Sequence, residues 1–307
     1  MGKARKKRID FKRWIPLYIM GIPGLLYLFI NNYMPLYGLL IAFKRFDYSK
    51  GVFGSPWAGL KNFEFLFQSD SAWVITRNTI LYNLVFMVLN MAISIFLAIL
   101  LNEVKSKAGK KFYQTMILLP YLMSMVIISY LVYAFLGDRT GLINGILRGM
   151  GQDPISFYAT EKYWPFILIF VNAWRGAGYG AVVYLASIVG FDNAYYEAAE
   201  LDGASKWQQI TQITIPLLKP TIIIMLTMSM GMVFRSDFGL FYQVPRNQGV
   251  LYDVTDTIDT FVYRALMQNG NLGLSSAAAF FQSIVCFITI MLFNGLVRKV
   301  SEEQALF

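Results

Sequence analysis

The chain has 307 residues, and 56% of them are hydrophobic, a content too high for a soluble globular domain of this size. It has no histidine and one cysteine, Cys286, which excludes an intrachain disulfide and weighs against a histidine-based metal site or proton relay. The net charge of +9 lies on basic residues beside apolar runs, which indicates contact with membrane lipid and a fixed orientation rather than nucleic-acid binding. The sequence therefore predicts a polytopic membrane protein.

The N-terminal part predicts one membrane span followed by an external loop. A basic arm, residues 1–13, precedes a charge-free run, residues 14–43, which is longer than the apolar core of a secretory signal. Basic residues beside a span favour the cytoplasm, so we expect the arm inside and the span running outward. The next segment, residues 44–77, is polar and is expected to be external, with a short surface helix over residues 62–67.

The second span is expected over residues 78–102, which carry no charge and can cross a hydrocarbon core of about 30 Å. Asn83 and Asn90 lie within it at a spacing that puts both on one helix face. These amides either bond to neighbouring helices or line a translocation path, and both interpretations remain open. The lysine-rich residues 105–111 predict a cytoplasmic loop, and a third span is expected over residues 112–136.

The fourth span, residues 163–190, contains polar residues near its middle, namely Asn172, Trp174 and Arg175. An arginine at the bilayer centre costs about 2.5 to 3.5 kcal/mol on insertion scales, so it should face protein or water and have a partner. Arg175 either forms an ion pair inside the bundle or lines a polar translocation path that meets substrate hydroxyls. In the second case Trp174 or Tyr179 would offer an aromatic face to the substrate.

Two glycine patterns bear on nucleotide binding. Gly176, Gly178 and Gly180 follow Arg175 inside an apolar span, where they predict close helix contact or local unwinding rather than a phosphate loop. The phosphate-binding pattern Gly-x-x-x-x-Gly-Lys-Ser/Thr does not occur in the sequence. We therefore expect no ATP hydrolysis by that route on this chain, and no enzyme activity or cofactor of its own.

Residues 192–215 form a polar amphipathic insert between two apolar segments and predict two short helices. Asp192 or Asn193 can cap the first helix, because a short side-chain oxygen accepts a bond from the free N–H groups of the opening turn. Gly203 can end that helix in the left-handed conformation that glycine adopts without steric cost. Ser205, with a glutamine three residues later, fits a capping box that starts the second helix.

The fifth span is expected over residues 215–240, with Arg235 and Asp237 near its outer end, where they either reach water or pair with each other. The last span lies within residues 265–297. The outer loop between these spans has three acidic residues without the glycine turn and terminal glutamate of a calcium loop, which predicts a solvated helix face: Asp253, Asp256 and Asp259.

These elements predict an all-α protein with six transmembrane helices. The first span and its external loop precede a five-helix core, residues 78–297, which includes the insert 192–215, and a tail, residues 298–307, ends the chain. Basic residues flank the first and last spans, so both termini are expected in the cytoplasm, and the insert on the same side.

The insert also carries a sequence pattern at a specific spacing. It resembles the cytoplasmic signature loop of binding-protein-dependent ABC importer permeases, and residues 53–67 are similar to the external entry segment of sugar-type permeases. Within the family the chain looks closest to the permeases that import oligosaccharides. Ile210 departs from the pattern, since many members have phenylalanine there. The residues that carry the loop pattern are Glu197, Ala198, Ala199, Asp202, Gly203, Ala204, Ile213, Pro216 and Pro220.

The resemblance implies the fold of a type I ABC importer permease, in which residues 192–215 form a coupling loop with a cytoplasmic coupling helix. It implies docking to an ATPase subunit through the residues of that loop: Glu197, Ala198, Ala199, Asp202, Gly203, Ala204, Trp207, Ile210, Ile213 and Pro216. It also implies the partners, which are a second similar permease, two ATPase subunits that bind ATP and Mg, an extracytoplasmic solute-binding protein and an oligosaccharide substrate. The location implied is the plasma membrane of a prokaryote.

Two other functions remain as alternatives. An ion-coupled secondary carrier predicts buried acidic or histidine residues and a matched pair of broken helices, neither of which is expected from this sequence. A membrane scaffold that transports nothing is the third hypothesis. Purification together with an ATPase, and ATP-dependent uptake into vesicles, would separate the three.

Overall fold

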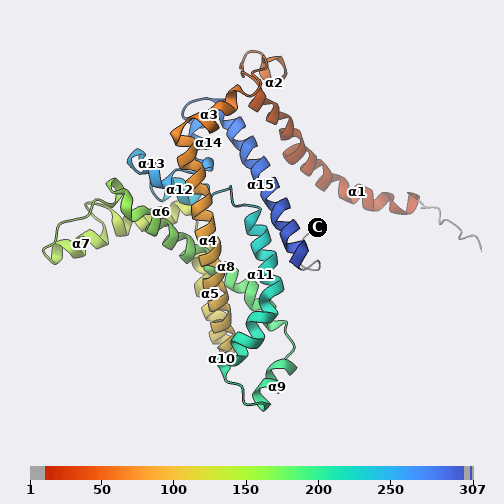
Figure 1. Ribbon diagram of the computed structural model, residues 1–307, viewed down its shortest axis with the longest axis vertical. Helices are drawn as coiled ribbons and strands as arrows, with labels where there is room; N and C mark the ends of the chain where they lie inside the picture. Colours follow the sequence, from red (N-terminus) through yellow and green to blue (C-terminus); the bar gives the residue numbers. More distant parts are fainter. Residues whose placement is uncertain (1–10, 301–304, 306–307) are drawn as a thin grey trace, which may run out of the picture.

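The computed structural model describes residues 11–300 and residue 305, and in them the chain is almost entirely helical. This confirms the all-α class. Much of the basic arm, residues 1–13, and of the tail, residues 298–307, lies outside the described residues. In chain order (Figure 1) the helices are α1 (Phe11–Leu28), α2 (Gly51–Gly54), α3 (Glu64–Gln68), α4 (Asp70–Glu103), α5 (Lys107–Leu122), α6 (Met125–Leu136), α7 (Leu142–Gly149), α8 (Trp164–Val189), α9 (Ala194–Leu201), α10 (Lys206–Gln209), α11 (Ile215–Met230), α12 (Phe238–Gln243), α13 (Tyr252–Thr255), α14 (Ile258–Met267) and α15 (Leu272–Val300).

Six segments have the length and apolar composition of membrane spans. Five are continuous helices: Trp14–Phe43, Asp70–Glu103, Glu161–Val189, Lys206–Met230 and Leu272–Lys299. The sixth consists of α5 and α6, which meet at a bend of 94° and count as one span if both belong to it. The structure thus has the predicted six spans when α5 and α6 are counted together as one broken span.

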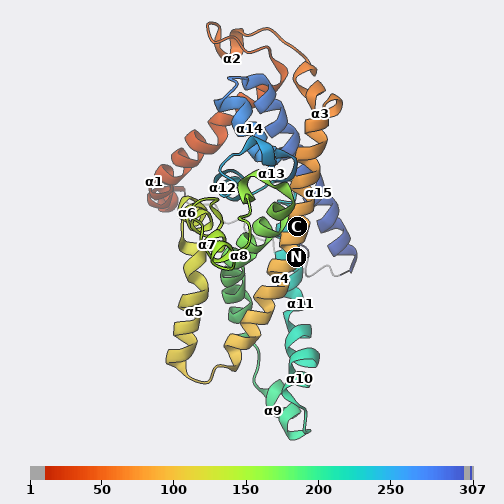
Figure 2. The same cartoon turned by 90° about the vertical axis from the view of Figure 1, so that its left-hand side faces the viewer.

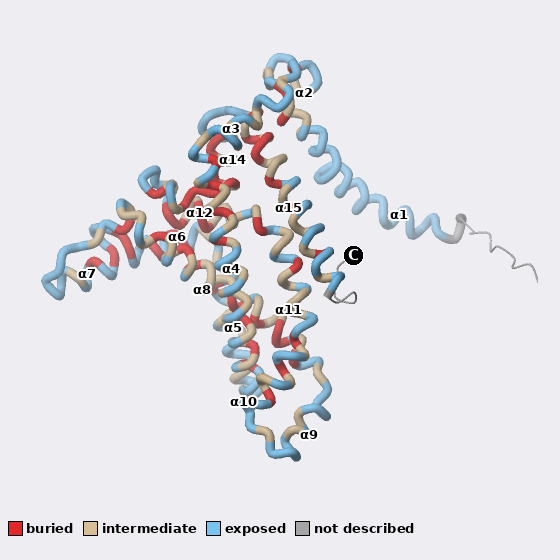
Figure 3. Tube along the Cα trace, in the orientation of Figure 1, coloured by how far each residue is buried: buried red, intermediate tan, exposed pale blue. Residues whose placement is uncertain are grey.

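The first span stands apart from the other helices. After α1 it continues through a π-helical turn, Phe29–Tyr33, and a 3-10 segment, Met34–Phe43. Every residue from 14 to 37 is exposed, and Figure 3 shows α1 in pale blue where it leans away from the bundle. A helix that is apolar on all sides is stable only when lipid or other protein surrounds it.

Helices of three other spans, α4, α5 and α11, pack around α8. Helix α4 lies along α8, α5 packs against α8 as well, and α11 contacts both α8 and α15. Figure 2 shows α9 and α10 at one end of the long axis and α2 and α14 toward the other. We call these the α9–α10 end and the α2–α14 end.

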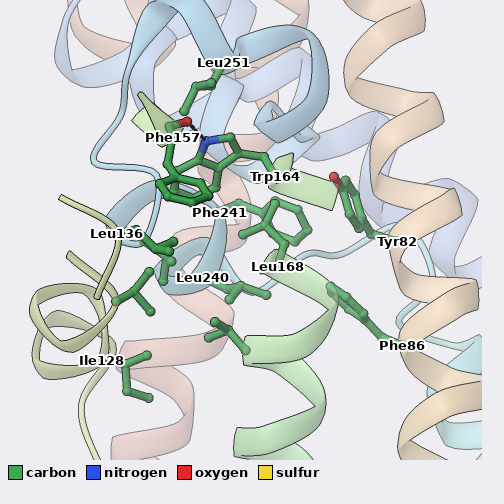
Figure 4. Packing of buried hydrophobic residues seen from close by; sticks show 13 residues of the cluster. Tyr82, Phe86, Ile128, Leu136, Phe157, Trp164, Leu168, Leu240, Phe241 and Leu251 are labelled. Carbon is green, nitrogen blue, oxygen red and sulfur yellow. Dashed lines mark hydrogen bonds between the residues drawn. The ribbon is translucent and has the colours of Figure 1, made fainter. Parts of the chain in front are cut away.

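The main hydrophobic core lies where α4, α6, α8 and α12 meet (Figure 4). At its centre Trp164 is fully buried, and its indole Nε1 donates a hydrogen bond of 2.8 Å to the carbonyl oxygen of Phe157. A second cluster joins α4, α8 and α11 nearer the α9–α10 end and includes Leu101, Tyr184 and Leu218. The two clusters hold α4 and α8 together as the frame for the other elements.

The structure interrupts two spans that the sequence predicts as continuous. The third, residues 112–136, breaks at Met123 and Ser124, whose extended backbone follows Pro120 in the last turn of α5. The fifth ends at Met230, so the prediction that it reaches residue 240 is wrong. An irregular segment separates it from α12, which Asp237 caps by accepting a bond from the Leu240 N–H.

Side chains from neighbouring spans make the second interruption tolerable. Asn83 on α4 donates hydrogen bonds to the carbonyl oxygens of Val233 and Arg235, at 2.9 and 2.8 Å. Gln282 on α15 donates to the carbonyl oxygen of Phe234 at 2.7 Å. Carbonyl groups that leave a helix inside a membrane need such partners, because no water replaces the lost helical bonds there. Asn83 therefore bonds to the irregular segment between α11 and α12 rather than to a neighbouring helix.

The three aspartates of the outer loop do not form a solvated helix face, so that prediction is wrong. Asp253 is exposed, but Asp256 is buried and pairs with Arg264, whose guanidinium lies 4.1 Å from the centre of the Tyr252 ring. Burial raises the pKa of the Asp256 carboxyl, and the charge of Arg264 opposes this shift. Asp259 accepts hydrogen bonds from Ser236 and Gln282. The described residues contain no cluster that could hold a metal ion.

Replacing Arg264 by alanine is expected to destabilise the α13–α14 segment by about 3 to 5 kcal/mol, because an unpaired carboxylate would remain buried. The side chains of Asp256 and Arg264 are only 10% and 11% exposed, so solvent screens this pair little. Thermal unfolding of the purified protein in detergent measures the effect. The double variant Asp256→Asn/Arg264→Met should lose clearly less stability than Arg264→Ala, and an equal loss in both would contradict this explanation.

Candidate functional site

The coupling loop, residues 192–215, has the local structure that its sequence predicts. Gly203 adopts a φ of 76°, and the Ala204 N–H donates to the carbonyl oxygen of Ala199 at 2.9 Å, which closes the end of α9. The capping box at Ser205 and Gln208 is present, with each residue bonding to the backbone N–H of the other. The tight turn between α9 and α10 therefore follows from local chemistry.

Asn193 occupies the N-cap position of α9, but its side chain makes no capping bond. The neighbouring Asp192 carboxylate accepts a hydrogen bond of 2.9 Å from the Ala194 N–H instead. The side chains of Tyr196 and Thr214 form a hydrogen bond of 3.0 Å that ties α9 to the start of α11. These contacts fix the orientation of α9 relative to the fifth span.

The helix that carries the second half of the coupling loop is longer than predicted. The fifth span was expected to start at residue 215, but one helix runs from Lys206 to Met230. It includes a π-helical turn, Ile210–Thr214, just before Pro216, which cannot donate a backbone hydrogen bond. Helices α10 and α11 are therefore parts of one helix.

The coupling loop presents its side chains outward at the α9–α10 end. Most of the residues predicted to dock are exposed, namely Glu197, Ala198, Asp202, Gly203, Trp207 and Pro216. The others are half-buried, namely Ala199, Ala204, Ile210 and Ile213.

Apolar side chains at this tip are unusually exposed. Leu201 at the end of α9 is 90% exposed and Trp207 on α10 is 72% exposed. The sequence analysis missed Leu201 and also Tyr195, which is 56% exposed. The sequence could have indicated both residues, because they are large and apolar and the short helices of the insert cannot bury them. The ion pairs formed among the described residues do not include Glu197. Several exposed apolar residues on one loop, together with an exposed carboxylate outside any ion pair, are typical of a surface that binds a partner.

A second group of polar residues lies inside the spans, where α8 passes the two interruptions. Asn172, Arg175 and Tyr179 occupy one face of α8, as their spacing requires. The Arg175 Nη1 lies 2.9 Å from the Asp237 Oδ2 at the start of α12. Asp237 therefore pairs with Arg175. One of the two interpretations of Asp237 was a pair with Arg235, and that interpretation is wrong.

Aromatic rings and amides surround this ion pair. The Arg175 guanidinium lies 5.8 Å from the centre of the Tyr121 ring, and Tyr121 stacks on Tyr179 with ring centres 4.8 Å apart. Asn90 on α4 donates a hydrogen bond of 2.8 Å to Asn172. Tyr121 was not predicted, although its position beside Pro120, near the break in the third span, was a sequence signal. We call Asn90, Tyr121, Asn172, Arg175, Tyr179 and Asp237 the polar cluster.

Two polar atoms of the cluster are buried without a partner. Among the described residues, the Asn90 Oδ1 and the Arg175 Nε accept or donate no hydrogen bond. A buried polar atom left unpaired costs about 1 to 3 kcal/mol, so such atoms usually meet water or a ligand. Of the residues predicted for a translocation path, Trp174 is 37% exposed and takes no part in these contacts, and Asn83 bonds to the backbone of the interrupted segment.

The glycines of α8 confirm the prediction of close helix contact. A methyl group at Gly178 would lie 1.9 Å from the carbonyl oxygen of Ile117 on α5, and one at Gly180 would lie 2.3 Å from the Ser94 hydroxyl on α4. Helix α8 itself is unbroken, so local unwinding is not their role. The small residues bring α4 and α5 close enough to α8 for their polar side chains to meet.

Comparisons with known proteins agree with these features. The family model described as binding-protein-dependent transport system inner membrane component matches residues 90–302, which is more than half of the chain. The polygalacturonan/rhamnogalacturonan transport system permease protein YteP of Bacillus subtilis (strain 168) is 36% identical, over 98% of this chain and 94% of its own. Protein LplB of the same organism is 31% identical, over 98% of this chain.

Solved structures show the same fold. A chain in the crystal structure of a bacterial ABC transporter involved in the import of the acidic polysaccharide alginate superposes with a TM-score of 0.86 at 33% identity. The similarity covers 95% of this chain and 98% of that one. With six spans, a coupling loop at one end and these similarities over nearly its whole length, the chain belongs to the family of inner-membrane components of binding-protein-dependent transport systems.

Proposed function

We propose that this permease moves an oligosaccharide from an extracytoplasmic binding protein into the cytoplasm, driven by ATP hydrolysis on two separate ATPase subunits. The chain is a transport subunit and not an enzyme. Its relatives include proteins named for polygalacturonan, rhamnogalacturonan, lactose and galactooligosaccharide transport, which supports a saccharide substrate. The observation that carries the proposal is the exposed α9–α10 tip on a chain that has no phosphate-binding loop.

The α9–α10 tip is proposed to insert into a cleft on an ATPase subunit that binds ATP and Mg. Glu197 would meet a basic residue there, while Trp207 and Ile210 fill an apolar socket and Leu201 adds to the same contact. Since α10 continues into α11, closure of the two ATPases around ATP would move the fifth span as a lever. No cofactor is needed on this chain.

A second permease is proposed to cover the exposed first span. Residues 14–37 have apolar side chains on all sides and contact little of their own bundle, so lipid and a neighbouring permease are the environments that fit them. In Figure 1 the free ends of α1 and α15 both point away from the α2 loop. This supports both termini in the cytoplasm of a prokaryotic cell, on the same side as the α9–α10 tip.

The polar cluster is proposed to form part of the translocation path. Its unpaired atoms, Asn90 Oδ1 and Arg175 Nε, can bond to sugar hydroxyls, and Tyr121 and Tyr179 offer ring faces to a pyranose. Asn83, Asn172 and Trp174 complete the residues proposed for this path. The position of the cluster beside both interrupted spans means that a movement of α11 can change its shape.

An ion-coupled carrier is the second candidate, because the structure contains two interrupted spans that the sequence analysis did not expect. Reconstitution of the purified complex into liposomes with a binding protein separates the two functions. Oligosaccharide uptake should require ATP on the side of the liposome membrane that the ATPase subunits face. It should persist when ionophores collapse all ion gradients. Uptake that continues without ATP and stops with ionophores would overturn the proposal, and a purified complex without an ATPase would do the same.

A further inference from the structure

A second polar site lies outside the polar cluster, in the loop that follows α12. Arg246 and Asn247 both have positive φ angles, 57° and 49°, in the left-handed region that asparagine tolerates but that is rare and strained for an arginine. The backbone N–H of Asn247 donates to the Tyr242 carbonyl oxygen at 3.0 Å, and its side chain accepts a bond of 3.0 Å from the Tyr252 hydroxyl. The rest of the fold therefore holds this turn in a strained conformation.

The strained turn presents Arg246 on a platform of aromatic rings. Its guanidinium lies 4.3 Å from the ring centre of Tyr133 and 5.8 Å from that of Tyr130, both on α6. Arg246 is exposed and is absent from the ion pairs formed among the described residues. A guanidinium that rests on aromatic faces keeps its N–H edge available, and that edge matches a carboxylate with two parallel hydrogen bonds.

A pocket of about 350 Å³ opens beside this arginine, within the size range of small-ligand sites. Two tyrosines, a serine, two amides, the arginine and one apolar side chain line it, namely Val126, Ser129, Tyr130, Tyr242, Gln243, Arg246 and Asn247. Aromatic faces and amide groups are the partners that a sugar ring needs, and the guanidinium adds a positive charge. The lining therefore fits a sugar that carries a negative group.

The pocket lies along the same two elements that border the polar cluster. Helices α6 and α12 both begin at the interruptions, where Asp237 pairs with Arg175, and the pocket is formed by residues farther along each helix. Each of the two arginines rests on tyrosines of the broken third span, Arg175 on Tyr121 and Arg246 on Tyr133. Two arginine side chains thus lie near α12. Arg175 of α8 lies at its start, and Arg246 lies beyond its end.

We propose that the Arg246 pocket is an outer subsite that selects oligosaccharides bearing a carboxylate, such as uronic acid units, before they reach the polar cluster. Arg246 binds the carboxylate, and Tyr130 and Tyr242 contact the sugar ring. This inference rests on the proposed function, since it assigns a substrate class to the same path. The competing role for Arg246, binding an acidic residue of the solute-binding protein, is an outcome of the test below.

The test uses the complete complex with its binding protein in liposomes and compares trigalacturonate with galactotriose, which has neutral hydroxymethyl groups in place of the carboxylates. Wild-type complex should import trigalacturonate. Arg246→Gln should lower kcat/KM for trigalacturonate by about tenfold or more, because a charge-assisted hydrogen bond is lost. Arg246→Lys should lie between the two, since it keeps the charge but not the planar fork. Arg139→Gln, at another exposed arginine of the loops beyond α6, should match wild type.

Three results would overturn the inference. One is unchanged trigalacturonate uptake in Arg246→Gln. Another is a rise in the binding-protein concentration needed for half-maximal ATPase stimulation in that variant, which would assign Arg246 to docking. The third is a wild-type complex that imports galactotriose but not trigalacturonate, which would leave the proposed function intact. A complex that imports neither sugar with ATP would overturn both.

Discussion

The variant Glu197→Lys is expected to insert normally into the membrane and to lose ATP-dependent uptake together with ATPase stimulation. Glu197 is exposed on α9 and forms no ion pair within the described chain, and it lies on the same loop as the exposed apolar residues Leu201 and Trp207. If it meets a basic residue of the ATPase, a lysine there places like charges in contact, which costs several kcal/mol. We expect the affinity for the ATPase subunit to fall by about a hundredfold or more, measured by purification of the complex and by its ATPase rate.

Glu103→Lys is the matched control for this charge reversal. Glu103 is also exposed and ends α4 in the same half of the molecule, but it lies outside the coupling loop. Membrane insertion of both variants should equal that of wild type. Normal uptake by Glu197→Lys, or an equal loss in Glu103→Lys, would contradict docking through α9.

The turn after α9 gives a second, geometric test of the same coupling. Gly203 has a φ of 76°, whereas proline fixes φ near −65°, so Gly203→Pro must change the angle between α9 and α10. We expect this variant to lose ATPase stimulation as Glu197→Lys does. Gly203→Asn should retain most of the uptake, because asparagine tolerates the left-handed conformation and nothing lies within 4 Å of a side chain there. Equal activity of the two variants would show that the shape of this turn does not matter.

The variant Arg175→Ala is expected to lower kcat/KM for uptake by about 10- to 100-fold, because it removes charge-assisted hydrogen bonds inside the membrane. The Arg175 and Asp237 side chains are 26% and 36% exposed, so water reaches part of the pair and a complete loss of folding is not expected. Uptake kinetics in liposomes measure the effect, and thermal unfolding measures the stability separately. Phe170→Leu, at an exposed apolar position of α8, should behave as wild type in both.

A double variant distinguishes a structural ion pair from a substrate contact. In Arg175→Gln/Asp237→Asn both charges are removed, so neither partner remains as an unpaired charge. If the pair only holds α8 against α12, the double variant should recover uptake relative to Arg175→Ala. If Arg175 contacts the substrate, uptake should stay low although stability returns. Full recovery of uptake would therefore remove Arg175 from the proposed path.

The helical class, the approximate positions of the spans and the caps of the coupling loop all follow from the amino-acid sequence. Charge-free runs flanked by lysine and arginine define spans because the cost of burying charge is a property of each residue. Ser205, Gln208 and Gly203 were assigned correctly because caps and left-handed turns depend on residues within one or two turns of each other. Such local signals need no knowledge of the neighbouring helices.

The breaks in the spans and the pairing of the charges depend instead on how the helices pack. The sequence predicts that the apolar helix continues from Met230 to Asp237, yet this segment is irregular. Asn83 and Gln282 from other spans donate hydrogen bonds to its carbonyl oxygens and stabilise it in that form. Asp237 pairs with Arg175, 62 residues away, rather than with the nearby Arg235. Contacts of this kind depend on how helices that are distant in the sequence pack against each other. The local sequence around one residue therefore does not predict them.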